Sequence, residues 1–351
     1  MKYKLAFIGY GVVAQGLTEI LIEKEEILKE KYDLEFAVVA ISDIKKGSVY
    51  DENGLDMENI LELVRQGKQI DKYPSGIKGM DSVQTIKETN ADVIVEVTFT
   101  DVKTGEPALT HIKTALENKK HVISTNKGPV VKKAGELLQL AEKNGVSYGF
   151  EGVVLAGTPA INLAQYTLAG NTISGFKGIL NGTTNYILTQ MENGMSYDEA
   201  LKKAQELGYA EADPTGDVEG LDALGKVVIL CNVILGKKIT WDQVERKGIT
   251  NISIDDIKKA KQEGKRWKLI GKAEIKQDGS LSAQVLPERL PLTDPLAGVM
   301  DATNALTYHT DELGSVTIVG PGAGKRETGF SLLIDLININ TNLTCKNKEQ
   351  N

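Results

Sequence analysis

A glycine turn near the N-terminus constrains the fold of this chain more than any other feature. The motif Gly9-x-Gly11-x-x-Ala14 follows a predicted strand, residues 2–8, that ends in an apolar run, and it precedes a segment whose apolar residues have helical spacing, residues 12–31. Gly9 permits a tight turn, Gly11 lets the backbone approach a ligand, and Ala14 lets the helix pack closely on a sheet. This strand–turn–helix unit is typical of dinucleotide-binding domains, in which the helix N-terminus holds the pyrophosphate.

Strands and helices alternate through the first 150 residues. Apolar, β-branched segments predict strands, and apolar residues at helical spacing predict the helices between them. The predicted strands are residues 2–8, 34–41, 92–97, 121–124 and 146–150, and the predicted helices are residues 12–31, 57–65, 107–118 and 130–143. This order predicts a Rossmann domain, with a doubly wound parallel sheet, for residues 1–150.

The pattern changes after Glu151. A capping-box signature beginning at Ser196 predicts a helix that ends at residue 207, and a second helix is expected over residues 217–235. Strand-like segments separated by turn residues are found at 173–180, 269–275, 281–286, 305–309 and 315–319. Residues 151–319 are therefore predicted to form an α+β domain with a mostly antiparallel sheet.

A late glycine-rich turn, residues 320–324, predicts a third segment. It opens a helix that is expected to run through Leu333, and the segment 320–351 ends in a polar tail. We expect this turn, with Gly322 at its centre, to return to the cofactor cleft of the first domain.

Composition narrows the range of partners. The net charge of -7 argues against nucleic acid or an anionic membrane as the main partner, because no excess of cations is present to neutralise phosphate. No apolar stretch approaches the roughly 20 residues that span a bilayer. Two cysteines, Cys231 and Cys345, exclude a disulfide framework and indicate a reducing compartment, the cytoplasm. The redox state of Cys345 stays open.

The segment from Gly208 to Lys226 gathers acids around the start of a predicted helix. Asp222 and Lys226 are four residues apart and would share one helix face. The apolar run at 227–231 indicates that this helix enters a core while its charged first turns line a cleft. Such a cleft fits a small substrate that carries an ammonium group. Asp217 also suits the helix N-cap.

The end of the second predicted strand bears on the cofactor. An acid there accepts bonds from the adenine ribose hydroxyls of NAD, whereas cations favour the 2′-phosphate of NADP. The sequence provides both, because Ser42 and Asp43 are followed by Lys45 and Lys46. NADP is favoured if Ser42 and either lysine face the ribose, and NAD if Asp43 does. We favour NADP and leave NAD, or the use of both, open.

Taken together, these motifs resemble homoserine dehydrogenase over nearly the whole chain, in the short form without an aspartokinase or a C-terminal regulatory domain. The matching segments, in the family's order, are residues 9–16, 124–127, 151–154, 179–186 and 208–214, followed by Asp217, Asp222 and Lys226. The resemblance implies reversible hydride transfer between L-homoserine and L-aspartate 4-semialdehyde with NAD(P), in threonine, methionine and isoleucine biosynthesis. It also implies a homodimer formed through the second domain.

The resemblance implies roles for individual residues. Lys226 would be the acid/base lysine, and Lys127 a second lysine near the nicotinamide. The implied substrate-binding residues are Glu211, Asp222, Asp217, Gly182 and Thr183, and the implied cofactor contacts are Gly9, Gly11, Val12, Val13, Ala14, Thr98, Lys127 and Gly322, besides Ser42 and Lys45 above. The chemistry agrees, because aldehyde reduction needs a proton at the developing alkoxide and a lysine of lowered pKa can supply it.

Residues 151–158 resemble the family's monovalent-cation loop, which joins the two domains. The implied sodium ligands are Glu151 and the main-chain carbonyls of Val154, Ala156 and Thr158, and oxygen ligands suit a hard cation. Carbonyl ligands leave little trace in a sequence, so a simple hinge between the domains stays open.

Other classes of function also stay open. A phosphorylating aspartate-semialdehyde dehydrogenase would join similar domains, but its chemistry needs a thiolate beside a base. Neither Cys231 nor Cys345 has a position that suits this role. Another semialdehyde or amino-acid dehydrogenase is a closer alternative. A non-catalytic NAD(P) sensor would keep the glycine turn but would not need Lys127, Lys226 and the acids.

Overall fold

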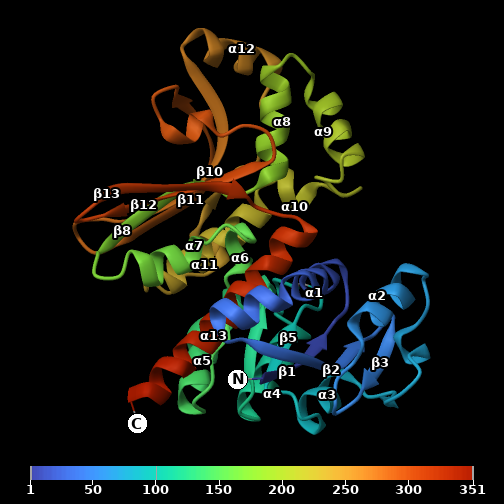
Figure 1. Cartoon of the computed structure of the whole chain (residues 1–351). Helices are drawn as coiled ribbons and strands as arrows, with labels where there is room; N and C mark the ends of the chain where they lie inside the picture. Colours follow the sequence, from blue (N-terminus) through green and yellow to red (C-terminus); the bar gives the residue numbers. More distant parts are fainter. Residues whose placement is uncertain (1, 100, 350–351) are drawn as a thin grey trace. The chain divides into compact units, whose positions relative to one another are not determined.

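The computed structural model describes residues 2–99 and 101–349, with side chains through residue 342, so Cys345 lies outside the described side chains. The chain divides into two compact units. The first contains Met1–Gly157 and Gly324–Asn351, and the second contains Thr158–Ala323 (Figure 1). No helix within the described residues has both the length and the apolar character needed to cross a membrane.

The first unit is built on a seven-stranded sheet in the order β4-β3-β2-β1-β5-β6-β7. Its strands are β1 (Lys2–Ile8), β2 (Glu35–Asp43), β3 (Gly47–Tyr50), β4 (Ile77–Lys78), β5 (Val93–Glu96), β6 (His121–Ser124) and β7 (Tyr148–Gly149). The five strands from β2 to β7 in this order are parallel, and β3 and β4 are added antiparallel at one edge. The predicted doubly wound parallel sheet is confirmed. The short strands β3 and β4 lie in segments for which the sequence predicted no strand.

Helices flank this sheet. They are α1 (Val12–Tyr32), α2 (Met57–Arg65), α3 (Ser82–Glu88), α4 (Ala108–Glu117), α5 (Lys127–Lys143), α6 (Gly152–Leu155) and α13 (Lys325–Glu349), with a 3-10 turn, η1, at Ile70–Lys72. The C-terminal helix α13 packs along α1, and the two share an apolar cluster with β1 (Figure 1). Helix α13 continues past the predicted end at Leu333, because Leu336 and Ile339 extend its buried face. Helix α5 begins three residues before the predicted start, because Asn126 caps it.

The second unit is built on a six-stranded sheet in the order β13-β12-β8-β10-β11-β9. Its strands are β8 (Ile173–Ile179), β9 (Glu245–Arg246), β10 (Lys265–Ile275), β11 (Leu281–Pro291), β12 (Thr303–Thr310) and β13 (Gly314–Pro321). All neighbouring strands are antiparallel except β9 and β11, which confirms a mostly antiparallel sheet.

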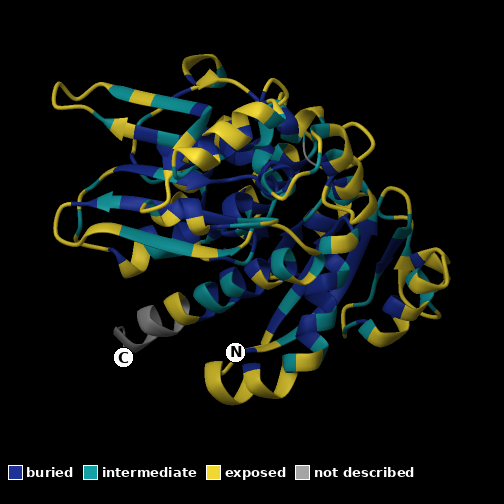
Figure 2. Cartoon of the chain, turned by 90° about the horizontal axis from the view of Figure 1, so that it is seen from above, coloured by how far each residue is buried: buried dark blue, intermediate teal, exposed yellow. Residues whose placement is uncertain are grey.

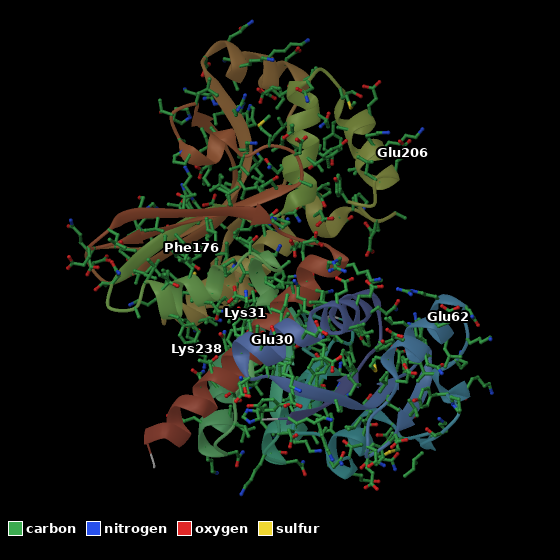
Figure 3. All side chains as sticks on the ribbon, viewed as in Figure 1. Glu30, Lys31, Glu62, Phe176, Glu206 and Lys238 are labelled. Atoms are coloured by element: carbon green, nitrogen blue, oxygen red, sulfur yellow. The ribbon has the colours of Figure 1, made fainter. Side chains whose placement is uncertain are left out.

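The helices of the second unit contact this sheet or one another. They are α7 (Ala160–Asn162), α8 (Gly182–Glu192), α9 (Tyr197–Glu206), α10 (Thr215–Val218), α11 (Leu221–Val233) and α12 (Ile254–Gln262), with short turns η2 (Leu163–Thr167), η3 (Trp241–Gln243) and η4 (Pro295–Gly298). The capping box at Ser196 is present at the start of α9. Figure 2 shows buried residues in dark blue along the strands and the helix faces, and Figure 3 labels the buried Phe176 of β8 and the exposed Glu206 of α9.

The prediction of a single helix over residues 217–235 is wrong. Two helices, α10 and α11, occupy this stretch, and Gly220 between them has a φ of 75°. This left-handed conformation costs residues with a Cβ roughly 1–2 kcal/mol, so glycine suits the break. Asp217 is consequently not an N-cap, because it lies inside α10, whose N-cap is Pro214. The break turns Asp217 and Asp222 toward a shared neighbour, Asn181.

Candidate functional site

The glycine turn of the first unit leaves the N-terminus of α1 open to an anion. Gly11 is the N-cap, no side chain caps the helix, and no acid occupies its first turn. A Cβ at Gly11 would meet no atom within 4 Å, and Val12 beside it is 63% exposed. Free N–H groups and the helix dipole at such an end favour phosphate. These residues fit the pyrophosphate of a dinucleotide.

Gly9 brings this turn against the end of a neighbouring strand. Its φ is 87°, and a Cβ there would lie 2.7 Å from the carbonyl oxygen of Val97, which follows β5. Only glycine allows both the conformation and the close approach. Ala14 is fully buried, whereas Val13 is partly exposed. The glycine turn and the residues after β5 therefore form one edge of the first unit, at the carboxyl ends of its parallel strands.

Asp43 ties the end of β2 to the glycine turn. Its carboxylate accepts hydrogen bonds from the backbone N–H of Tyr10 at 2.7 Å, of Lys45 at 2.8 Å and of Lys46 at 2.9 Å. Burial alone would raise the pKa of Asp43, but these three bonds lower it below its ordinary value. Asp43 is therefore held as a carboxylate beside the turn.

A pocket of about 520 Å³ opens beside Asp43. Its lining includes Ser42, Asp43, Ile44, Asp71, Lys78 and Asp81. The hydroxyl of Ser42 is buried and donates to the carbonyl oxygen of Met80 at 3.3 Å, and the side chain of Lys45 is exposed. The ammonium of Lys78 donates to the carbonyl oxygens of Tyr73 and Ser75.

Thr98 and Lys127 follow adjacent parallel strands of the first unit. In the register of β5 and β6, Glu96 pairs with Ser124, so the loops that carry Thr98 and Lys127 leave the sheet at the same edge. Thr98 donates its backbone N–H to Glu96 at 3.2 Å, and Lys127 is the first residue of α5. Both residues are partly exposed.

The polar cluster of the second unit is centred on Lys226, whose side chain is buried within α11 at 5% exposure. Its ammonium donates to the carbonyl oxygen of Leu180 at 2.6 Å and lies 2.8 Å from Asp222 Oδ2. Asn181 donates to Asp217 Oδ1 at 2.7 Å and to Asp222 Oδ2 at 3.0 Å. The i, i+4 pair expected from the sequence is thus present, with the lysine buried and the aspartate partly exposed, at 6% and 23% side-chain exposure.

Two carboxylates in this cluster face one ammonium. Burial raises the pKa of Asp217, the charge of Asp222 adds to the rise, and the hydrogen bond from Asn181 opposes it. Thr183, in the first turn of α8, donates its hydroxyl to the carbonyl oxygen of Tyr209 at 2.6 Å. The excess of acid over base suits a ligand with a positive charge.

The predicted glycines of the second unit lie close to a buried amide. A Cβ at Gly182 would lie 2.6 Å from the carbonyl oxygen of Ala302, and one at Gly322 would lie 2.2 Å from the side-chain amide of Asn304. Both polar atoms of that amide are buried, and neither has a hydrogen-bond partner within the described part of the chain. Glu211 does not join this cluster: its side chain is exposed, and its carbonyl accepts a bond from Gln205.

The expected cation loop contains a second buried acid. Glu151 is almost fully buried, and its backbone N–H donates to Asp335 Oδ2 at 3.1 Å. Burial raises the pKa of Asp335 well above its ordinary value, and the charge of Glu151 adds to the rise. Val154 lies in α6, and Ala156 after it has a φ of 48°. In the second unit, Thr158 donates its hydroxyl to the carbonyl oxygen of Pro321 at 3.0 Å. A buried negative centre fits a cation, although no group of three or more Asp, Glu, His or Cys side chains suited to a metal was found in residues 2–99 and 101–349.

Reasoning from the sequence gave no site role to Asn181, Asn126 or Glu96. Asn181 bridges the two acids and caps α8 by accepting from the N–H of Thr184 at 2.9 Å. Asn126 caps α5 in the same way. The available signal was an asparagine placed between a strand and a helical segment in both cases. For Glu96 the signal was a single charge within an apolar strand.

A Rossmann unit with an open helix N-terminus, joined to a second unit with a buried lysine among acids, defines an NAD(P)-dependent oxidoreductase. Two family models match the chain: the NAD binding domain of homoserine dehydrogenase over residues 9–151, and homoserine dehydrogenase over residues 159–337. The chain belongs to the homoserine dehydrogenase family, whose enzymes act on a CH–OH group.

Individual relatives agree with this family. The NAD(+)-dependent homoserine dehydrogenase of Pseudomonas canavaninivorans is 45% identical over 98% of both chains. The crystal structure of a candidate homoserine dehydrogenase from Archaeoglobus fulgidus has a TM-score of 0.86 and 36% identity, with 96% of this chain and 99% of that chain covered. A hyperthermophilic archaeal homoserine dehydrogenase mutant in complex with NADPH has a TM-score of 0.83 and 29% identity, with coverages of 97% and 98%.

The raised pKa of Asp217 predicts a gain of stability when its charge is removed. The folded state holds the proton of Asp217 more tightly than the unfolded chain does, so ionisation destabilises the fold as the pH rises above the ordinary value of 3.8. We expect Asp217→Asn to raise Tm by a few degrees at pH 7, on a scale of roughly 2–4 °C per kcal/mol. The gain should vanish near pH 3.

The exposed Asp213 provides the matched control. Hydrogen bonds from the side chain and backbone of Thr215 lower its pKa, so Asp213→Asn should leave Tm unchanged or lower it. Thermal unfolding followed by circular dichroism at several pH values measures both variants. A lower Tm for Asp217→Asn at pH 7 would contradict the destabilising role of this charge.

Proposed function

We propose that the chain catalyses the reversible oxidation of L-homoserine to L-aspartate 4-semialdehyde, with Lys226 as the acid/base residue. The buried ammonium of Lys226, held by Asp222 and the carbonyl oxygen of Leu180, is the observation that carries this proposal. NAD(P), when bound, supplies or accepts the hydride. Lys226 then has one task, which is to hold or move the proton of the substrate hydroxyl.

The surroundings of Lys226 support this task. Asp222 and Leu180 restrict the direction of the ammonium, so its proton is presented from a fixed position. In aldehyde reduction the lysine gives a proton to the developing alkoxide, and in alcohol oxidation the neutral amine takes it back. We propose Lys127 as the catalytic lysine of the first unit, and Thr98 with the glycine turn as the cofactor contacts.

Asp217 and Asp222 suit the ammonium group of an amino-acid substrate. The cluster has one more carboxylate than ammonium groups, and the charge of a bound substrate would balance it. We propose that Gly182 and Thr183 contact the substrate from the first turn of α8. Glu211, whose side chain is exposed, is proposed as a further carboxylate for the ammonium.

The residues that line the pocket beside Asp43, which we propose holds the adenosine of the cofactor, favour NAD rather than NADP. Asp43 is held as a carboxylate at the glycine turn, and Asp71 and Asp81 line the same pocket. Lys78 is its only lysine or arginine among the described lining residues, and its ammonium is bound to two carbonyl oxygens. A 2′-phosphate would therefore meet mostly negative charge. This proposal departs from the NADP preference that the sequence favoured through Ser42 and Lys45.

A sodium ion is proposed at Glu151, with carbonyl oxygens of Val154, Ala156 and Thr158 as the further ligands. The buried carboxylate of Glu151 supports a cation, because oxygen ligands suit a hard ion such as sodium. A homodimer, a cytoplasmic location and a role in threonine, methionine and isoleucine biosynthesis stay predictions from the family resemblance.

Cys231 does not suit the nucleophilic cysteine that a phosphorylating dehydrogenase needs. This thiol is buried, and burial raises its pKa to about 12, whereas a nucleophilic cysteine must form a thiolate. Oxidation of homoserine without phosphate therefore distinguishes the proposed reaction from that rival, and any turnover excludes a non-catalytic sensor.

The role of Lys226 is tested by Lys226→Met, which removes the proton but keeps the aliphatic chain. We expect kcat for homoserine oxidation to fall by about 10²–10⁴, the usual size of acid–base catalysis, with little change in the Kd of NADH. Lys268→Met is the control, because Lys268 is a second buried lysine of the same unit, bound to Asn185 and Val299. It should lose stability and keep turnover within about tenfold. Turnover near the wild-type value in Lys226→Met would remove Lys226 from the mechanism.

Cofactor preference is tested at Asp43. We expect the wild type to have the higher kcat/KM with NAD, and Asp43→Asn to reduce the ratio of NAD to NADP by about tenfold or more, since a hydrogen bond to a charged group contributes about 1.5–3 kcal/mol. Asp81→Asn neutralises another acid of the pocket that already caps α3, and it should change the ratio less. A wild-type preference for NADP would overturn the assignment.

The cation is tested by thermal unfolding in sodium chloride and in choline chloride at equal ionic strength. Because an ion that binds only the folded state stabilises it, the wild type should have the higher Tm in sodium chloride. Glu151→Gln should abolish this difference in Tm. A third measurement in potassium chloride shows whether the site prefers sodium to potassium. Equal Tm values of the wild type in all three salts would exclude the site.

A further inference from the structure

Glu96 is a buried charge in the first unit to which the proposed function gives no role. It is the last residue of β5, is 0% exposed, and stands in register between Ile8 of β1 and Ser124 of β6. Parallel strands end here at the edge where the sheet order reverses between β1 and β5, and ligands of doubly wound sheets bind at this edge. A carboxylate at this position needs several donors to offset its loss of water.

Donors from three elements surround the carboxylate. Glu96 Oε1 accepts the backbone N–H of Thr98 at 3.2 Å and the hydroxyl of Thr98, and His111 Nδ1 of α4 lies 3.5 Å from it. Glu96 Oε2 accepts the hydroxyl of Ser124 at 3.1 Å. Oε1 therefore faces the loop after β5 and helix α4, and Oε2 binds the last residue of β6.

The hydrogen bonds continue from Ser124 to the start of α5. Ser124 Oγ accepts the backbone N–H of Asn126 at 3.0 Å, and Asn126 Oδ1 accepts the N–H of Gly128 at 3.3 Å. The Asn126 amide also donates to the carbonyl oxygen of Phe99 at 2.9 Å and to that of Thr98 at 3.4 Å. These bonds close a ring from Glu96 through Thr98, Asn126 and Ser124 back to Glu96. Lys127 is the residue directly after Asn126.

We propose that Glu96 is a positioning residue that couples Thr98 to Lys127 by holding the loops after β5 and β6 in one arrangement. The inference rests on the proposed function, in which Thr98 contacts the cofactor and Lys127 acts in catalysis. Glu96 Oε1 has to accept, because the backbone N–H of Thr98 can only donate, and Oε2 accepts the hydroxyl of Ser124 at the end of β6. Glutamine would remove the negative charge, and with its oxygen kept toward Thr98 its NH₂ group would donate to the hydroxyl of Ser124 and reverse that hydrogen bond.

A residue that only stabilises the fold would behave differently. Loss of such a residue lowers Tm and changes binding and turnover only in proportion to the unfolded fraction. Loss of a positioning residue changes cofactor binding and turnover in fully folded protein, because misplacement by about 1 Å can reduce rates about 10²-fold. The two roles are separated by measuring Kd of NADH, kcat for homoserine oxidation, and Tm on the same full-length variants.

Three variants test the coupling. Glu96→Gln should raise the Kd of NADH and lower kcat, each by about tenfold or more. Ser124→Ala removes only the branch to Asn126 and should lower kcat by about tenfold while changing Kd by less than about threefold. The control, Lys120→Met, removes a buried charge at the opposite end of β6, where its ammonium donates to the carbonyl oxygen of Thr89 at 2.7 Å. It should lower Tm and leave Kd and kcat within about threefold of the wild type.

The double variant Glu96→Gln with Ser124→Ala completes the cycle. If Ser124 acts through Glu96, the second change should add little to the loss of kcat caused by the first, because residues of one network are not additive. Full additivity would overturn the coupling. So would a Glu96→Gln protein that binds NADH and turns over as the wild type does at a temperature where it is folded. Should Glu96→Gln fail to fold, Ser124→Ala alone decides, and unchanged kcat in that variant rejects the proposal.

Failure of the proposed function gives a separate result. If the wild type and Lys120→Met bind NADH but do not oxidise homoserine, the assigned reaction is wrong. The Kd values of NADH for Glu96→Gln and Lys120→Met then still test whether Glu96 positions the cofactor loop: a tenfold rise confined to Glu96→Gln supports the positioning of Thr98, and equal values reject it.

Discussion

The polar site of the second unit depends on the buried ammonium group of Lys226. Removing the ammonium of Lys226 from water costs several kcal/mol, and this cost is offset only by partners with good geometry. Asp222 and the carbonyl oxygen of Leu180 are those partners. Because Leu180 directly follows β8 and Asn181 caps α8, the same contact fixes where the strand ends and where the helix begins. Without the cation, Asp217 and Asp222 would be two adjacent carboxylates joined by one amide.

Much of the fold could be predicted from the period of the apolar residues. Residues 5–8 of β1 and 93–95 of β5 are continuous apolar runs buried on both faces, and α1 has apolar residues at helical spacing, so their alternation predicts the parallel sheet. The two-residue strand β4 is too short to show a period, and its pairing with β3 depends on contacts distant in sequence. The break at Gly220 was missed for another reason: a single glycine in a helical pattern is compatible with a helix, and only its left-handed φ marks the end.

The candidate site could be predicted only where its contacts are local. The spacing of Asp222 and Lys226 predicts their pairing, because residues four apart share a helix face. Nothing in the sequence shows that the carbonyl oxygen of Leu180, 46 residues away from Lys226, completes the site. A backbone carbonyl has no side-chain signature. The position of Asp43 was also open, since the sequence places acid and base together at the end of β2 and only the bond to Tyr10 shows which one faces the turn.

Each unit contains a buried charged side chain, and the two charges have opposite sign. Glu96 and Lys226 are both buried beside the end of a strand, and each is held by groups from the loops that follow. Glu96 has no lysine or arginine among its hydrogen-bond partners in the described residues. The cluster around Lys226 contains two carboxylates, those of Asp217 and Asp222. A buried charge held by fixed hydrogen bonds interacts strongly with a charged ligand, because water does not screen it. The groups that hold it are already oriented, so they need not move when the charge of a bound ligand changes. Burial and the charge of Asp222 raise the pKa of Asp217, so this acid destabilises the fold when it is ionised.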